Sequence, residues 1–262
     1  MLENHSRGCH RHVSVTRQTD RDPYRGRDPR TIPAYPLADA ARYLHIPERT
    51  IQNWAYGYPY ATKTAGRRRT APLIEAEAGA SYDFSFFNLI ELHVLAGLRR
   101  EHHLQMPTIR RAIDYLRREI GSPRPLIDEQ METDGVDIFV TKLGALINAS
   151  RSGQLALKRV LQEHLKRIDR DAHGIAERLF PFTRPRVASR EAAQLTSQPR
   201  VVAIDPAVAF GRPVIAGSRV PTAEVFERFI AGESPEMLAA DFGRRVEEVY
   251  EAIRCEKYAV AA

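Results

Sequence analysis

Amphipathic helical stretches separated by turn residues dominate the pattern of the chain. Apolar residues recur at spacings of three and four over residues 35–44 and 47–55, with His45 and Ile46 interrupting between them. This pattern predicts two short helices joined by a tight turn at the front of the molecule.

Longer helices are expected further along the chain. The same spacing runs over residues 85–102, over 107–120, where Gly121 and Pro123 end it, and over 157–168. These segments predict a mainly helical middle region.

Short β-structure is predicted at two places. Residues 136–141 and 145–149 carry β-branched and aromatic residues around a glycine-containing turn, which predicts a hairpin. Residues 201–204 and 213–215 predict a second pair of strands. The fold class expected is therefore mainly α with short β-hairpins.

Composition divides the chain into four parts. Residues 1–30 are rich in arginine and poor in aliphatic residues, which predicts a disordered basic tail, either a plain solvated leader or an arm that reaches DNA. Residues 31–182 form the expected DNA-binding and helical domain, residues 183–199 a linker without sustained periodicity, and residues 200–262 a C-terminal domain.

The overall composition favours a globular protein with a polyanionic partner. Apolar residues make up 43% of the sequence, and 39 Lys and Arg face 33 Asp and Glu. Cys9 and Cys255 are the only cysteines, which excludes a disulfide framework and fits a reducing compartment. With no apolar run of about 18 residues and no signal-peptide pattern, we expect a cytoplasmic protein without a membrane segment.

Catalysis is not expected from the motifs present. The sequence shows no glycine-rich phosphate loop, no nucleophile with an arranged histidine and no paired carboxylates in a suitable context. The nine histidines are scattered, and His93, His102 and His103 are read as helix surface. We expect no enzyme activity, no cofactor and no metal.

The second short helix presents side chains suited to reading DNA. If Ile51 and Trp54 face the core, helical geometry turns arginine and amide side chains outward, and these bind guanine and adenine edges. A basic stretch follows over residues 56–79 and reads as a loop or wing that contacts phosphates. The predicted DNA-binding residues are Arg49, Thr50, Gln52, Asn53, Tyr56, Lys63, Arg67, Arg68 and Arg69. A plain helical hairpin beside a solvated loop is the alternative.

Residues 35–54 resemble the N-terminal helices of MerR-like regulators. The matching positions are Leu37, Ala41, Leu44, Ile46, Thr50, Ile51 and Trp54. The resemblance implies a winged helix-turn-helix whose second helix enters the major groove. His45 stands where the family has a turn glycine, a position with positive φ that histidine accepts only at some cost.

Residues 201–262 resemble the bacterial domain of unknown function 433. The motif Asp205-Pro206, the segment Gly211 to Pro221 and the segment Ala231-Gly-Glu-Ser-Pro-Glu carry the likeness. Ser234 is expected to cap a helix with Pro235 at its first position, which yields a small α+β helix-turn-helix-like domain.

The C-terminal domain is expected to bind protein rather than DNA. Its last helix is acidic, and this charge opposes phosphates. The predicted partner-binding residues are Arg219, Glu247, Glu248 and Glu251. Two alternatives stay open: Arg244, Arg245 and Arg254 could bind DNA, and Arg219 could pair internally with Asp205 or Glu224.

The combination of the two domains is similar to VapB-type antitoxins. This resemblance implies the antitoxin of a type II pair, which neutralises a PIN-domain ribonuclease toxin and represses its own operon. It also implies double-stranded operator DNA, the toxin and a second copy of the chain as partners, in a homodimer or a larger assembly with the toxin. The alternative is a stand-alone dimeric transcription regulator, in which the C-terminal domain only dimerises.

Overall fold

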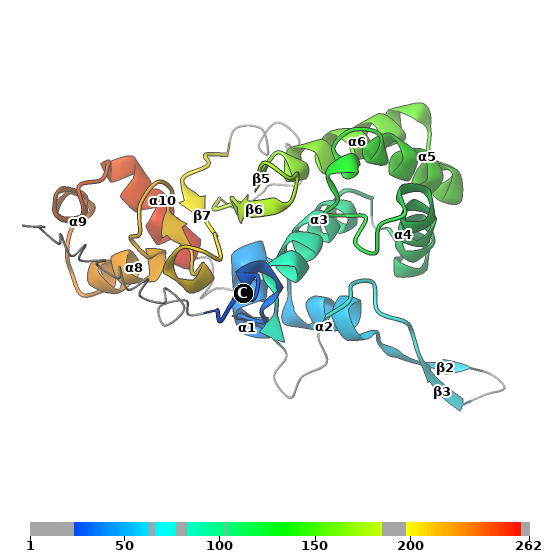
Figure 1. The fold of residues 1–262 in the computed structure, drawn as a ribbon, viewed down its shortest axis with the longest axis horizontal. Helices are drawn as coiled ribbons and strands as arrows, with labels where there is room; N and C mark the ends of the chain where they lie inside the picture. The colour runs from blue at the N-terminus through cyan, green and yellow to red at the C-terminus, as the bar shows by residue number, and fades with distance from the viewer. Residues whose placement is uncertain (1–23, 63–65, 77–82, 103, 185–197, 258–262) are drawn as a thin grey trace, which may run out of the picture.

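The computed structural model describes residues 24–62, 66–76, 83–102, 104–184 and 198–257. Helices dominate these residues, and the strands form two-stranded antiparallel sheets. Figure 1 shows the C-terminal helices at one end of an elongated molecule and the middle helices at the other, with the N-terminal helices between them. The predicted fold class, mainly α with short β-hairpins, is confirmed.

The first two helices form the predicted helix-turn-helix. Helix α1 spans Leu37–Leu44 and helix α2 spans Glu48–Tyr56, with Pro47 as the N-cap of α2. His45 caps α1 in the left-handed conformation, with φ 52°, as the missing turn glycine implied. Its Nε2 lies 2.9 Å from the carbonyl oxygen of Phe182, a polar contact that offsets part of the backbone strain.

A hairpin follows α2 as the predicted wing. Strands β2 (Pro59–Thr62) and β3 (Gly66–Arg69) pair antiparallel and project away from the helices (Figure 1). Gly57 at the base has φ 69°, and a Cβ there would lie 1.9 Å from the carbonyl oxygen of Thr70. Only glycine fits between α2 and the returning strand.

Two helices beyond the wing build the core on which the helix-turn-helix rests. Strand β4 (Asp83–Phe84) pairs with β1 (Tyr35–Pro36) and leads into α3 (Phe86–His102), whose described residues are almost all buried. Helix α4 (Met106–Ile120) ends at Gly121 in the left-handed conformation, so both predicted helices are confirmed.

The hairpin predicted over residues 136–149 is wrong, because this stretch forms helix α5 (Gly135–Ile147). Its buried residues Val136, Phe139, Val140 and Leu143 recur at helical spacing, so packing overrides the β-propensity of its branched residues. Gly144 is not a turn residue: a Cβ there would come within 2.7 Å of the Gln154 side chain, so it permits close helix packing.

Helix α6 and a small hairpin close the middle region. Helix α6 covers Arg151–Leu165 and packs against α3 and α5. The predicted helix extended to residue 168, but Ile168 belongs to strand β5 (Ile168–Arg170), which pairs with β6 (Ala176–Leu179).

The C-terminal domain contains the predicted strand pair and helices. Strands β7 (Val202–Ala203) and β8 (Val214–Ile215) are antiparallel, and the 3-10 turn η5 lies between them. Helices α8 (Thr222–Ile230), α9 (Pro235–Phe242) and α10 (Val246–Lys257) follow. Ser234 caps α9 by accepting a hydrogen bond from the Met237 N–H, and Pro235 is at its first position, as expected.

The C-terminal domain is continuous with the rest of the molecule. The backbones of Leu179 and Ile204 exchange hydrogen bonds of 2.8 and 2.9 Å, and Arg178 pairs with Asp205 at 3.1 Å. Ile204 belongs to the main hydrophobic core. The strand pair of the C-terminal domain therefore extends onto the β5–β6 hairpin.

A buried arginine joins the chain on either side of residues 185–197. Arg167 is 4% exposed, and its guanidinium donates hydrogen bonds to the carbonyl oxygens of Phe180, Pro181, Gln198 and Pro199. Four backbone acceptors thus surround one buried cation.

Residues 1–23 of the expected basic tail lie outside the described residues, and residues 24–30 make defined contacts. The Tyr24 hydroxyl donates a hydrogen bond of 2.7 Å to the carbonyl oxygen of Pro206. Arg30 pairs with Asp28 and Asp171. These contacts correct the predicted tail, which extended to residue 30.

Candidate nucleic-acid interface

Helix α2 exposes part of the set of residues predicted to read DNA. Arg49 is exposed and Gln52 and Asn53 are half-buried, because Ile51 and Trp54 face the core as the helical spacing predicted. Arg49, Gln52 and Asn53 therefore line the outer edge of α2, which is called the reading edge below. All three side chains can donate hydrogen bonds to base edges in the major groove.

Two other residues of that set are largely occupied by the protein itself. Thr50 is 8% exposed. Tyr56 packs against the core, and its ring centroid lies 6.2 Å from that of Phe84. These two residues therefore hold α2 in place and offer little surface for contact with DNA.

The wing adds a cationic and aromatic edge. Arg68 and Tyr60 pair directly across the two strands, and both are exposed. Directly opposed residues on antiparallel strands share a face, so these two side chains project together. Lys63 lies outside the described residues, and for Arg67 only its backbone in β3 is described.

Arg69 has a structural task at the base of the wing. Its guanidinium donates hydrogen bonds to the carbonyl oxygens of Tyr56 and Gly57, at 3.0 and 3.1 Å. These oxygens end the recognition helix, where a cation is favourable. Arg69 therefore fixes the wing to α2.

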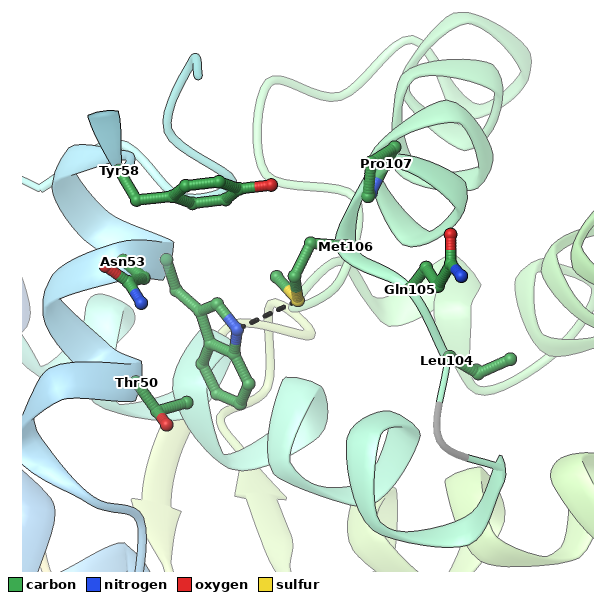
Figure 2. A pocket seen from close by; sticks show the side chains of 8 residues that line it. Thr50, Asn53, Tyr58, Leu104, Gln105, Met106 and Pro107 are labelled. Atoms are coloured by element: carbon green, nitrogen blue, oxygen red, sulfur yellow. Dashed lines mark hydrogen bonds between the residues drawn. The ribbon is translucent and has the colours of Figure 1, made fainter. Parts of the chain in front are cut away.

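An open pocket lies beside the reading edge, on the side of α4. Its volume is about 520 Å³, and its walls come from α2, the start of the wing and the segment that begins α4. Figure 2 shows Asn53 and Tyr58 across from Met106 and Pro107. The indole N–H of Trp54 donates to the Met106 sulfur at 3.2 Å (Figure 2).

Some of the predicted partner-binding residues are exposed, and others form ion pairs or hydrogen bonds within the protein. Arg219 and Glu247 are exposed. Glu248 pairs with Arg244 at 3.0 Å and accepts from the Arg245 N–H at 2.9 Å. Of the two possible internal partners of Arg219, Asp205 and Glu224, Asp205 pairs with Arg178.

Glu251 faces the interior, which corrects its assignment to an exposed partner surface. It is 2% exposed and accepts hydrogen bonds from Thr183 and Arg184, at 2.5 and 2.9 Å, and from Arg254. These cationic and hydroxyl partners, opposing burial, hold the pKa of Glu251 below its usual value. The carboxylate anchors α10 to the end of the middle region.

Sequence reasoning missed a contact that ties the helix-turn-helix to the C-terminal domain. Arg42 of α1 forms an ion pair with Glu256 of α10, which is 4% exposed. The two residues lie 214 positions apart, and periodicity within either helix carries no signal for such a pair.

His93 is buried rather than on a helix surface, with its Nε2 3.1 Å from the carbonyl oxygen of His164. Among the described residues, no group of three His, Cys, Asp or Glu side chains is placed to hold a metal ion. None of the helices in the described part of the chain is long and apolar enough to cross a membrane.

Two known domain families match the two ends of the chain. Residues 33–113 match the family described as "Putative DNA-binding HTH domain". This range contains α2, the wing and the residues that line the pocket. Residues 202–254 match "Protein of unknown function (DUF433)".

Proteins of Mycobacterium tuberculosis are similar to most of the chain. "Putative antitoxin VapB45" is 29% identical over 238 residues, which cover 85% of this chain and 93% of that protein. "Uncharacterized protein Rv2308" is 24% identical over 262 residues, which cover 95% of this chain and 96% of that protein. The crystal structure of Rv2018 has a TM-score of 0.61 at 24% identity, covers 85% of this chain and 98% of its own, and shows the same fold.

The chain thus carries an N-terminal helix-turn-helix domain of a family described as DNA-binding and a C-terminal domain of unknown function 433, and it is homologous over most of its length to a protein named as an antitoxin of the VapB type.

Proposed function

We propose that this protein is a DNA-binding antitoxin-like regulator without catalytic activity of its own. In this proposal it represses its operon and neutralises a PIN-domain ribonuclease toxin. The observation that carries the DNA-binding part is the outer edge of α2, where Arg49, Gln52 and Asn53 lie next to a wing that exposes Arg68.

The two elements have different tasks on a duplex. The amides and Arg49 of α2 discriminate bases in the major groove, because arginine pairs bidentately with guanine and Asn or Gln with adenine. The wing, through Arg68, contacts phosphates and adds affinity that is independent of sequence.

A second copy of the chain completes the DNA-binding unit. The two half-sites of a symmetric operator lie about 34 Å apart. One helix such as α2 cannot contact both half-sites at once, so two copies of the chain are needed. We therefore propose that the active species is a MerR-like homodimer, alone or within a larger assembly with the toxin.

The proposed toxin-binding surface lies on the C-terminal domain around Arg219 and Glu247, which are exposed. Glu248 and Glu251 are left out of this surface because both are held by the protein's own arginines. A stable complex needs an interface of about 1,200–2,000 Å² in total, so these residues mark part of a larger area.

DNA binding is tested with the fragment upstream of the protein's own coding sequence. Arg49→Ala should weaken binding to this fragment by about 1–3 kcal/mol while leaving binding to unrelated DNA unchanged. Arg151→Ala, which removes an exposed arginine of α6, is the control. Equal losses on both DNAs, or a loss only in Arg245→Ala, would reject α2 as the reader and favour the arginines of the C-terminal domain.

Toxin binding is tested by co-purification with the protein encoded by the neighbouring gene and by its ribonuclease activity. The charge reversals Arg219→Glu and Glu247→Arg should reduce inhibition, whereas Glu119→Arg on α4 should not. If no neighbouring PIN-domain protein is bound, the stand-alone dimeric regulator is the better account.

A further inference from the structure

The pocket beside α2 is large enough for a small molecule and shares only Asn53 with the reading edge. Its volume of about 520 Å³ lies in the range of small-molecule sites, about 300–1,000 Å³. Arg49 and Gln52 do not line it; Thr50, Asn53 and Trp54 of the same helix do. A ligand in this pocket would therefore contact α2 from the side next to the DNA.

The lining selects an uncharged ligand. All the described residues that line the pocket are neutral, among them Thr50, Asn53, Gln105 and Met106. A charged ligand would lose hydration there without gaining an opposite charge. The cationic wing does not offset this loss, because Arg68 and Arg69 are outside the lining.

The shape and polar groups favour a flat ring with hydrogen-bonding edges. Tyr58 provides an aromatic wall, and its hydroxyl points across the opening toward Pro107 (Figure 2). Trp54 also lines the pocket, but it is 2% exposed and offers little ring surface. The Asn53 amide offers both a donor and an acceptor. The indole N–H of Trp54 donates only to the Met106 thioether, a weak acceptor that a ligand oxygen or nitrogen can replace.

We propose that this pocket binds a neutral planar heteroaromatic molecule of the nucleobase or nucleoside class, and that its binding and operator binding exclude each other. The exclusion rests on the proposed DNA-binding function and on Asn53, which belongs both to the reading edge and to the pocket wall. The same chemistry could come from a free nucleoside or from a base extruded from DNA; we assign the free molecule, because the lining is neutral and a DNA base brings its phosphates.

The sequence provides its own probe, because Trp54 is the only tryptophan. Adenosine, guanosine, cytidine and thymidine are titrated into the full chain without DNA while Trp54 fluorescence is recorded. A saturable change with at least one nucleoside, and weaker binding of its 5′-monophosphate at equal ionic strength, is the expected result. No saturable change with any of the four, or tighter binding of the monophosphate, overturns the assignment.

Two variants separate the pocket from the reading edge. Tyr58→Leu removes one aromatic wall and should weaken nucleoside binding about tenfold, the effect of losing one stacking contact. Gln52→Ala should leave nucleoside binding unchanged while it weakens operator binding. Unchanged nucleoside binding in Tyr58→Leu would place the ligand elsewhere and overturn the proposal.

Competition is then measured with the upstream DNA fragment. The bound nucleoside should raise the Kd for this fragment in the wild-type protein and have about a tenfold smaller effect in Tyr58→Leu. Nucleoside binding without any effect on the Kd overturns the exclusion.

If only DNA changes the fluorescence and free nucleosides do not, the pocket takes a base of the duplex and the free-ligand assignment is wrong. The titration without DNA decides the ligand even if the operator proposal fails.

Discussion

Arg42 in the first helix of the helix-turn-helix and Glu256 in the last helix of the C-terminal domain form an ion pair inside the protein. The Arg42 side chain is 26% exposed and that of Glu256 is 5% exposed. Thr222 at the start of α8 also donates a hydrogen bond of 2.5 Å to Glu256, so the carboxylate joins three helices. The orientation of the helix-turn-helix is therefore coupled to the C-terminal domain.

Removal of the cation from this pair should destabilise the protein strongly. Arg42→Ala leaves Glu256 buried with Thr222 as its remaining partner, and an uncompensated buried charge costs about 3–5 kcal/mol. The lower end of this range is expected, because Arg42 is partly exposed. Urea unfolding followed by circular dichroism measures the change.

An exposed ion pair of the C-terminal domain serves as the control. Arg245 pairs with Glu248 at 3.4 Å, and its side chain is 74% exposed. Arg245→Ala should change the free energy of unfolding by no more than about 0.5 kcal/mol. Similar losses in both variants would mean that burial does not strengthen the Arg42–Glu256 pair.

Two glycines in helices should respond in opposite directions to alanine. At Gly97 of α3, a Cβ would lie 2.8 Å from Nδ1 of the fully buried His164, so Gly97→Ala should destabilise the protein by about 1–3 kcal/mol. At Gly153 of α6, the nearest atom would be 3.5 Å away, so Gly153→Ala should stabilise it by about 0.5–1 kcal/mol. Thermal unfolding of the two variants side by side gives the signs, and a stabilised Gly97→Ala would mean that α3 and α6 pack less closely than described.

Glu91 should make stability depend on pH near neutrality. Burial, only partly opposed by Arg124 at 3.0 Å and by Asn88, raises the pKa of Glu91 to about 7. Because the folded-state pKa lies above the unfolded value of about 4.5, protonation of Glu91 stabilises the folded protein. This stabilisation is complete below about pH 4.5 and is lost as the pH rises through about 7. The loss amounts to about 3 kcal/mol.

Glu91→Gln removes this titration. The free energy of unfolding of the wild-type protein should fall more steeply between about pH 4.5 and pH 7 than that of the variant. Urea unfolding at several pH values tests the difference in slope. Parallel curves for the two proteins would show that Glu91 titrates normally.

The wing should determine how DNA binding depends on salt. Loss of one phosphate contact reduces the slope of log Kobs against log salt concentration by about 0.9. Arg68→Ala should show this change on operator and unrelated DNA alike, because phosphates carry no sequence information. Fluorescence anisotropy over a range of salt concentrations measures it, and an unchanged slope would remove Arg68 from the DNA interface.

Local sequence signals predicted the elements whose causes are local. Apolar spacing located α1, α2, α3 and α4, and Gly121 and Ser234 act as the helix caps that their residue types suggest. The left-handed conformation of His45 was expected from the resemblance to MerR-like regulators, which have a turn glycine at this position. For the reading edge, the burial of Ile51 and Trp54 was enough to place Arg49 outside.

Features that depend on distant partners were not predictable in this way. The residues of α5 favour strands by type, but contacts with α4 and α6 select the helix. Glu251 looks like a surface acid within its own helix, yet Thr183 and Arg184 from the middle region bury it. The pocket is equally non-local, because Trp54 and Met106 meet only after α4 folds back toward α2.

The guanidinium of Arg167 holds backbone on both sides of residues 185–197, and this has a consequence for the integrity of the molecule. Burial lowers the pKa of Arg167 to about 10, so the guanidinium stays charged at physiological pH and its bonds to Pro181 and Pro199 persist there. The hydrogen bonds of Arg167 and the backbone hydrogen bonds between Leu179 and Ile204 join the chain before residue 185 to the chain after residue 197. None of these links is covalent. A protease that cut the chain within residues 185–197 would therefore leave two fragments that migrate as one particle until a denaturant separates them.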